Sequence, residues 1–141
     1  DNKNNKENLL FFESNGEKDL NFSQYKVDLK KILDVVCVKY NVYIKPHPRL
    51  GCSDILVEYK VEYIPNLIPS ELINVNYFNM IIGVNSTSIA TISHPKSYWL
   101  IELFSFVDGN RKKYLKKYLE NICDTKLNCI VEIDSKHNIF S

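Results

Sequence analysis

Short apolar runs alternate with amphipathic stretches along the chain. The runs are bounded by polar residues, glycine or proline, which is typical of strands buried in a sheet. They span 9–12, 42–44, 80–84, 98–104 and 129–133. Segment 55–64 is ambiguous, with strand character over 61–64.

The longest amphipathic stretch, 24–40, predicts a helix with Ser23 as a suitable N-cap. Its apolar residues recur at the spacing of one helical face: Leu29, Ile32, Leu33, Val36 and Tyr40. A second amphipathic helix is predicted over 110–122, and shorter helices over 70–75 and 86–92.

Strands that alternate with helices predict βαβ units and a mostly parallel sheet. We therefore expect an α/β fold, a Rossmann-like three-layer sandwich. The polar segment 1–8 is expected to be a disordered tail, and 9–141 to form one domain. Ligands of such sheets bind beyond the carboxyl ends of the strands, so the residues that follow each strand are the candidates for chemistry.

Composition and charge narrow the function classes. The net charge of +1 offers no strong field for nucleic acid, so no nucleic-acid partner is expected. The four cysteines match no zinc-ligand spacing, so no zinc site is expected. No apolar run is long enough to span a membrane and the first residues do not resemble a signal peptide, which favours a cytoplasmic location.

The first candidate segment, Lys45-Pro46-His47-Pro48-Arg49, follows the 42–44 run. The two prolines restrict the backbone around His47 and would aim its imidazole. Lys45 and Arg49 add positive charge that suits an anion. The alternative is a proline-rich strand exit whose histidine faces solvent.

The second candidate segment, Asn85-Ser86-Thr87-Ser88, lies where the 80–84 run passes into a predicted helix. A helix N-terminus presents unpaired N–H groups and a partial positive charge, and the hydroxyls add donors, which together suit a phosphate. The alternative is an ordinary N-cap.

The third candidate segment, Pro69-Ser70-Glu71, opens the short helix predicted over 70–75. A carboxylate at Glu71 can accept hydrogen bonds from ribose hydroxyls. The alternative is an acidic residue that suits the helix dipole. Together the three segments supply a cation, hydrogen-bond donors for an anion and an acceptor for ribose hydroxyls along one edge of one sheet. All three are less expected to occur together by chance than any one of them alone.

A Lys-x-His-Pro segment, a Pro-x-Glu segment and a strand that ends in a hydroxyl pair, in this order, resemble the bacterial sialyltransferases of the GT-B fold. The nearest members are the lipooligosaccharide and capsule sialyltransferases, and the resemblance covers about 9–104. It implies that the chain is the C-terminal, donor-binding half of such an enzyme. It also implies CMP-sialic acid as the donor, a surface glycan as the acceptor, and inverting, metal-independent transfer. The chain has no Asp-x-Asp metal motif, which agrees with this implication, so neither a metal nor another cofactor is expected.

The resemblance implies a role for each matching residue. His47 matches the histidine that contacts the donor phosphate as CMP departs, which makes it the expected catalytic residue. Lys45 matches a lysine near the nucleotide, and Glu71 matches the acidic residue that holds the ribose. The other residues implied to bind the substrate are Pro48, Pro69, Ser86, Thr87 and Ser88.

One departure from the family concerns the general base, which the family carries in a doubled-acid-glycine motif of a separate N-terminal acceptor domain. The related strings here, Glu13-Ser14-Asn15-Gly16 and Val107-Asp108-Gly109, lack the doubled acid. We therefore expect this chain to bind a CMP-sugar without transferring the sugar by itself. The glycan acceptor is expected to bind through the N-terminal half.

Two other functions remain open. One is another cytidine-nucleotide enzyme, such as a Kdo transferase or a polyol-phosphate transferase; against the latter, Val84-Asn85 stand where Asp-Tyr is expected. The other is a non-catalytic nucleotide-binding or interaction domain. This alternative remains because the general-base motif is absent from the sequence.

Two further features have a structural interpretation. His94-Pro95 ends a predicted helix, so a helix stop is favoured over a ligand. The basic cluster of the 110–122 helix is favoured as a solvated face, with peripheral contact to the inner face of a bacterial membrane as the alternative. Its members are Arg111, Lys112, Lys113, Lys116 and Lys117.

Overall fold

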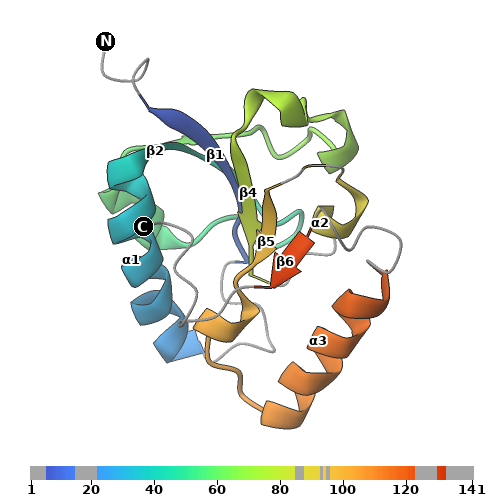
Figure 1. The fold of residues 1–141 in the computed structure, drawn as a ribbon. Helices are drawn as coiled ribbons and strands as arrows, with labels where there is room; N and C mark the ends of the chain where they lie inside the picture. The colour runs from blue at the N-terminus through green and yellow to red at the C-terminus, as the bar shows by residue number, and fades with distance from the viewer. Residues whose placement is uncertain are drawn as a thin grey trace.

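A computed structural model describes residues 6–14, 22–84, 88–92, 94, 96–122 and 130–132. Within these residues six strands form one sheet in the order β3-β2-β1-β4-β5-β6, and every neighbouring pair is parallel (Figure 1). This is the strand order of a doubly wound Rossmann sheet. The expected Rossmann-like α/β fold is therefore confirmed. The strands are β1 Glu7–Phe12, β2 Tyr40–Lys45, β3 Val61–Tyr63, β4 Met80–Gly83, β5 Ser97–Trp99 and β6 Ile130–Glu132.

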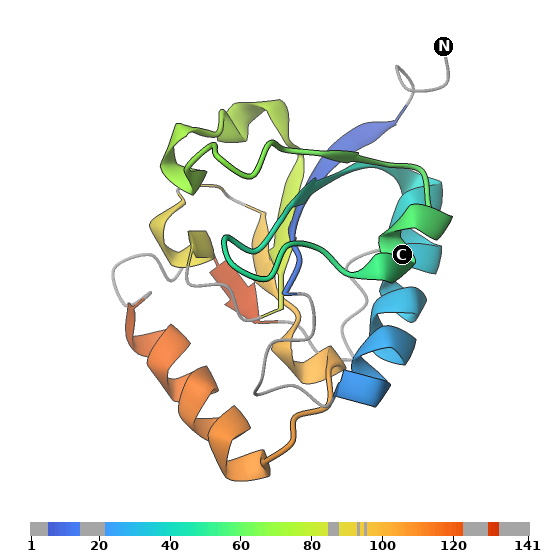
Figure 2. The same ribbon diagram turned by 180° about the vertical axis from the view of Figure 1, so that it is seen from behind.

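Helices cover both faces of the sheet. Helix α1, Phe22–Lys39, lies on one face, whereas α2, Ser88–Thr91, and α3, Gly109–Ile122, lie on the other (Figures 1 and 2). A sheet covered on both faces needs apolar side chains on both, which explains the continuous apolar runs 9–12 of β1 and 80–82 of β4 at its centre. No helix among the described residues is long and apolar enough to cross a membrane.

Strand β1 divides its side chains between two cores. Leu9 and Phe11 lie in the core under α1, while Leu10 and Phe12 lie in the core that includes Ile89 of α2 and Leu119 of α3. This division follows from the alternation of side chains along a strand. Alternate side chains of β1 thus contact the helix layers on the two faces of the sheet, which gives the expected three layers.

Two element boundaries near the N-terminus differ from expectation. Strand β1 begins at Glu7, because Glu7 and Asn8 pair with Tyr40 and Asn41 of β2, so both belong to the sheet and not to a tail. Residues 1–5 of the expected tail lie outside the described residues. Helix α1 begins at Phe22, so Ser23 lies inside its first turn and is not the N-cap.

Two expected elements differ from prediction, and a third is described only in part. The apolar run 98–104 is a strand only to Trp99; the buried Leu100 and Ile101 do not continue it, and Ile101–Leu103 form the 3₁₀ turn η5. Periodicity cannot tell a buried strand from another buried conformation in so short a run. The expected helix 70–75 consists of 3₁₀ turns, η3 Ser70–Leu72 and η4 Val75–Tyr77, and the expected helix 86–92 is described only as the one-turn α2.

Candidate functional site

The carboxyl ends of β2, β1 and β4 lie side by side at one edge of the sheet. Phe12, the last residue of β1, is in register with Lys45 of β2 on one side and with Gly83 of β4 on the other. The strand order reverses direction at β1, because β2 follows on one side and β4 on the other. Ligands of open α/β sheets bind in the crevice at such a switch point. The fold therefore contains the edge of the sheet after which a ligand is expected to bind.

Lys45 is a buried cation at this edge, with 5% of its surface exposed. Val42 and Ile44 of β2 lie in the core under α1, so strand alternation places Lys45 with Tyr43 on the sheet face that carries α2 and α3. Within the described part of the chain, the Lys45 ammonium has neither a hydrogen bond nor an ion pair. A buried charge without a counter-charge is costly, because the ammonium loses its hydration without compensation.

Burial and neighbouring charges shift the pKa values of Lys45 and Cys52. Burial lowers the pKa of Lys45 below its ordinary 10.5, and the neighbouring Cys52 opposes this shift. Burial, followed by the Glu13 carboxylate, raises the pKa of the Cys52 thiol, whereas Lys45 lowers it. Cys52 thus lies near both a buried acid and a buried base, and the two charges act on it in opposite directions.

Glu13 is the buried acid, directly after β1, with 2% of its surface exposed. Its Oε1 accepts a hydrogen bond from the backbone N–H of Ser53 at 2.7 Å, and its Oε2 accepts one from the Ser53 hydroxyl at 2.8 Å. Oε2 also accepts a hydrogen bond from the Tyr25 hydroxyl of α1. Glu13 was not among the predicted site residues. Its position directly after the 9–12 run was the signal that could have identified it.

His47 belongs to a tight turn beyond β2. Its backbone exchanges hydrogen bonds of 3.0 Å with Gly51, whose φ of +71° favours glycine. The His47 Nδ1 accepts the backbone N–H groups of Arg49 at 3.1 Å and Leu50 at 3.2 Å. An accepting Nδ1 carries no proton, so the neutral ring has its proton on Nε2, which is then a donor. Pro48 is exposed within the turn.

The Nδ1 atom of His94 makes the same kind of contact with the backbone as that of His47, and its Nε2 atom makes a second contact within the fold. Its Nδ1 accepts the backbone N–H of Lys96 at 3.0 Å, two residues on, as His47 does with Arg49. Its Nε2 donates to the carbonyl of Phe78 at 2.7 Å, and the residue is buried. Both ring nitrogens of His94 therefore serve the fold, in agreement with the interpretation that this histidine is not a ligand.

The structure brings the 69–71 segment to the start of α2. The Ser70 hydroxyl donates to the Ser88 hydroxyl oxygen at 3.4 Å, a long contact that nevertheless joins two of the three predicted segments. Pro69 is the N-cap of η3, and Glu71 lies in its first turn with an exposed side chain. Glu71 is therefore accessible, as a ribose acceptor must be, but no described contact fixes its carboxylate.

The hydroxyl pair of the second segment, Ser86 and Thr87, lies outside the described residues. Ser88 is the first residue of α2 as the structure describes it, and this described part of the helix is one turn long. The side chain of Ile89 in α2 lies directly against Gly83 of β4. A Cβ at this position would lie 2.6 Å from the Cδ1 of Ile89, closer than real contacts allow.

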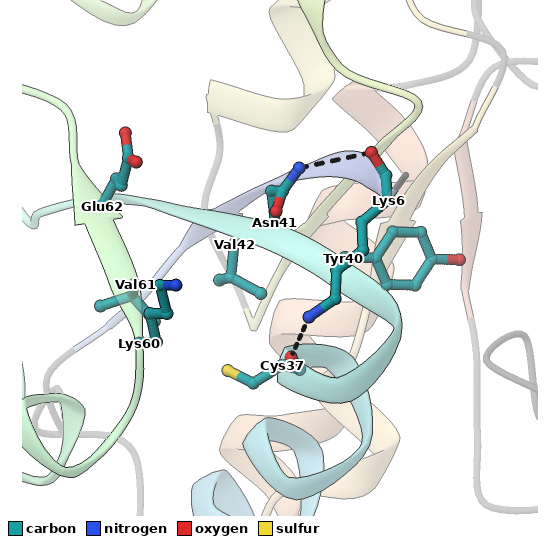
Figure 3. A pocket seen from close by; sticks show the side chains of 8 residues that line it. All are labelled: Lys6, Cys37, Tyr40, Asn41, Val42, Lys60, Val61 and Glu62. Atoms are coloured by element: carbon teal, nitrogen blue, oxygen red, sulfur yellow. Dashed lines mark hydrogen bonds between the residues drawn. The ribbon is translucent and has the colours of Figure 1, made fainter. Parts of the chain in front are cut away.

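A separate hollow lies at the opposite, amino edge of the sheet. It has a volume of about 210 Å³ and lies where the C-terminal end of α1 meets the starts of β1, β2 and β3 (Figure 3). The Lys6 ammonium donates to the Cys37 carbonyl at 3.4 Å, and Asn41 donates to the Lys6 carbonyl at 3.3 Å. None of the predicted site residues lines this hollow. No group of three metal-ligating side chains is found among the described residues.

Comparisons with known proteins were made at three levels. No family model matches the chain, and neither a curated protein nor a solved structure matches it.

Proposed function

We propose that the carboxyl edge of the sheet binds the phosphate of a cytidine nucleotide sugar, and that the chain is the donor-binding domain of a sialyltransferase-like glycosyltransferase. The observation that carries the proposal is Lys45, a buried ammonium without a described counter-charge at the end of β2. A bound phosphate supplies that counter-charge, and its attraction to an ammonium that has lost part of its hydration is stronger than between two groups in water.

The spacing of the edge favours a ligand larger than a bare phosphate. Lys45 is the last residue of β2 and Ser88 is the first residue of α2, the helix after β4, and β1 lies between the two strands. Two interstrand spacings amount to about 10 Å, which a nucleotide can span and an isolated phosphate cannot. In this proposal Lys45 and the Nε2–H of His47 hold the phosphate, and the exposed Glu71 accepts hydrogen bonds from the ribose.

The donors would act most strongly when CMP leaves. Departure of the nucleotide places negative charge on the phosphate oxygens, and preorganised donors stabilise a transition state in which that charge develops. The turn bonds to Nδ1 hold the His47 ring before any ligand binds, which is the form of preorganisation that this role requires. The general base for sugar transfer would come from the acceptor half that the family resemblance implies.

Calorimetric titration with CMP tests the proposal, with UMP, AMP and inorganic phosphate as controls. CMP should bind more tightly than each control, and Lys45→Met should weaken CMP binding about tenfold or more, as expected for loss of a charge-assisted contact. Absence of CMP binding, or unchanged binding in Lys45→Met, would contradict the proposal. If a purine nucleotide binds as tightly as CMP, the cytidine assignment fails.

A pair of His47 variants separates contact with the phosphate from turn formation. The Asn side-chain oxygen in His47→Asn can accept the same backbone N–H groups as Nδ1, so the turn is retained while the Nε2 donor is lost. His47→Ala loses both. Equal loss of CMP affinity in the two variants supports contact through Nε2, whereas wild-type affinity in His47→Asn would limit His47 to the turn.

A further inference from the structure

The chain carries its positive charge very unevenly. Helix α3 contains five cations and one acid, Glu120, for a net charge of +4. Because the whole chain has a net charge of +1, the remaining residues carry −3. A basic helix on an otherwise acidic protein produces a field that orients the molecule toward an anionic surface.

The inner side of α3 is fixed by packing. Leu119 is buried in the core on this face of the sheet, and Leu115 packs against the same core. The Lys112 ammonium donates to the Phe104 carbonyl at 3.2 Å and lies 5.6 Å from the centre of the Phe106 ring. Lys112 is therefore part of the attachment of the helix, and only the opposite side is available to a partner.

The outer side of α3 combines cations with half-exposed aromatic rings. Tyr114 and Tyr118 are one turn apart, with 59% and 44% of their surfaces exposed. Lys113 and Lys117 are exposed with the same four-residue spacing, so the two pairs run side by side along the helix. The Arg111 guanidinium lies 5.1 Å from the centre of the Tyr114 ring. Val107, just before the helix, is 71% exposed.

We propose that this outer face of α3, formed by Arg111, Lys113, Tyr114, Lys117 and Tyr118, docks on a lipid surface that contains anionic headgroups. Lysine and arginine attract the anionic headgroups, and tyrosine rings are favoured at the boundary between headgroups and acyl chains. The inference does not depend on the nucleotide proposal.

Charge complementarity favours a lipid surface over a nucleic acid. Helix α3 lies at the side of the fold with its length exposed along the outside of the ribbon, so a flat surface can meet its outer side (Figure 1). The residues outside α3 have a net charge of −3, so they supply no additional attraction to a nucleic acid that extends beyond the helix. The exposed Val107 also gains from contact with lipid rather than with phosphate backbone.

Co-sedimentation of the full chain with phosphatidylcholine vesicles, prepared with and without phosphatidylglycerol, tests this proposal. Binding should require phosphatidylglycerol and weaken as salt is added, because salt screens exposed charges. The double variant Lys113→Glu/Lys117→Glu should lower the apparent affinity at least tenfold. Tyr114→Ser/Tyr118→Ser should remove the part of the binding that remains at high salt.

The control variant Lys31→Glu/Lys60→Glu makes the same change in net charge at exposed positions outside α3. It should bind vesicles as the wild type does, and circular dichroism should show that every variant is folded. Equal loss in both charge variants would show a general charge effect and overturn the proposal. Failure to bind anionic vesicles would overturn it too, as would a single-stranded oligonucleotide that binds α3 when the vesicles do not.

Discussion

The carboxylate of Glu13 accepts two hydrogen bonds from Ser53, from the backbone N–H at 2.7 Å and from the hydroxyl at 2.8 Å. Both residues are buried, and they are 40 positions apart in the chain. The pair attaches the loop that carries His47 to the end of β1, and the Tyr25 hydroxyl attaches the same carboxylate to α1. The geometry of the candidate site therefore depends on a residue that does not belong to its motifs.

Replacement of Glu13 by Gln should destabilise the fold by about 1–3 kcal/mol, because an amide cannot accept from three donors with both of its polar atoms. Urea denaturation measures this change. The exposed Glu58→Gln is the matched control and should change the free energy of unfolding by less than about 0.5 kcal/mol. In a double-mutant cycle, Glu13→Gln and Ser53→Ala should be non-additive; additive effects would show that the pair is not coupled.

Lys45→Met should change stability and binding in opposite directions. It removes a buried charge that has no described counter-charge, so the free energy of unfolding should rise by about 1 kcal/mol or more. The same change should weaken CMP binding. Denaturation and calorimetry on one sample measure both effects, with the exposed Lys31→Met as control. A variant that is less stable than the wild type would show that the ammonium is compensated in the folded chain.

CMP affinity should depend on pH through Lys45, whose pKa burial lowers below 10.5. A bound phosphate favours the charged ammonium, so affinity should fall as the pH rises through this lowered pKa. The second pKa of a phosphomonoester is about 6, so the charge of CMP is constant over this range. Titrations at increasing alkaline pH measure the trend, which should be absent in Lys45→Met. A flat wild-type profile would exclude Lys45 as the phosphate partner.

The same lowered pKa predicts the sign of a stability change. Between the folded pKa of Lys45 and 10.5, the unfolded chain binds more protons than the folded chain at this residue. The contribution of Lys45 to the free energy of unfolding should therefore rise as the pH increases across that window. The difference between wild type and Lys45→Met, followed by urea denaturation against pH, isolates this contribution.

The two His-Pro pairs should differ in their effect on stability. His94→Ala leaves the buried Phe78 carbonyl without its 2.7 Å partner, which should cost about 1–3 kcal/mol. His47→Ala removes turn bonds at a more exposed position and should cost no more than about 1 kcal/mol. Thermal or urea denaturation ranks the two. A larger loss for His47→Ala would show that its turn, and not the His94 bridge, supports the core.

Cys37 should react slowly with iodoacetamide. Burial, with a smaller effect of Asp34, raises the pKa of its thiol from 9.0 to about 11, while Lys6 opposes the shift. At pH 8 the thiolate fraction should be about 100-fold lower than for an ordinary thiol, and alkylation slower in proportion. Mass spectrometry of the Cys37 peptide measures the rate, with the urea-unfolded chain as reference. Equal rates in both states would contradict the shift.

The sequence by itself determined the elements in which a clear apolar pattern extends over several residues. The repeat of Leu29, Leu33 and Val36 predicted α1, and the apolar runs of β1 and β4 predicted buried strands. The sequence also predicted that candidate ligand-binding residues lie at the carboxyl ends of the strands. Lys45, the last residue of β2, lies at that end of the sheet. These features are local, because a helix or strand displays its period within its own residues.

The tertiary structure decided which segments meet. The strand order, the bond from Glu13 to Ser53 and the burial of Lys45 each depend on contacts between segments far apart in the chain. His47 and His94 both accept a backbone N–H two residues on through Nδ1, and the contact of His94 with the Phe78 carbonyl, 16 positions away, could not be predicted from the His-Pro sequence. Burial and partners are properties of the assembled core, since the free energy of a polar group depends on what surrounds it and not on its neighbours in sequence.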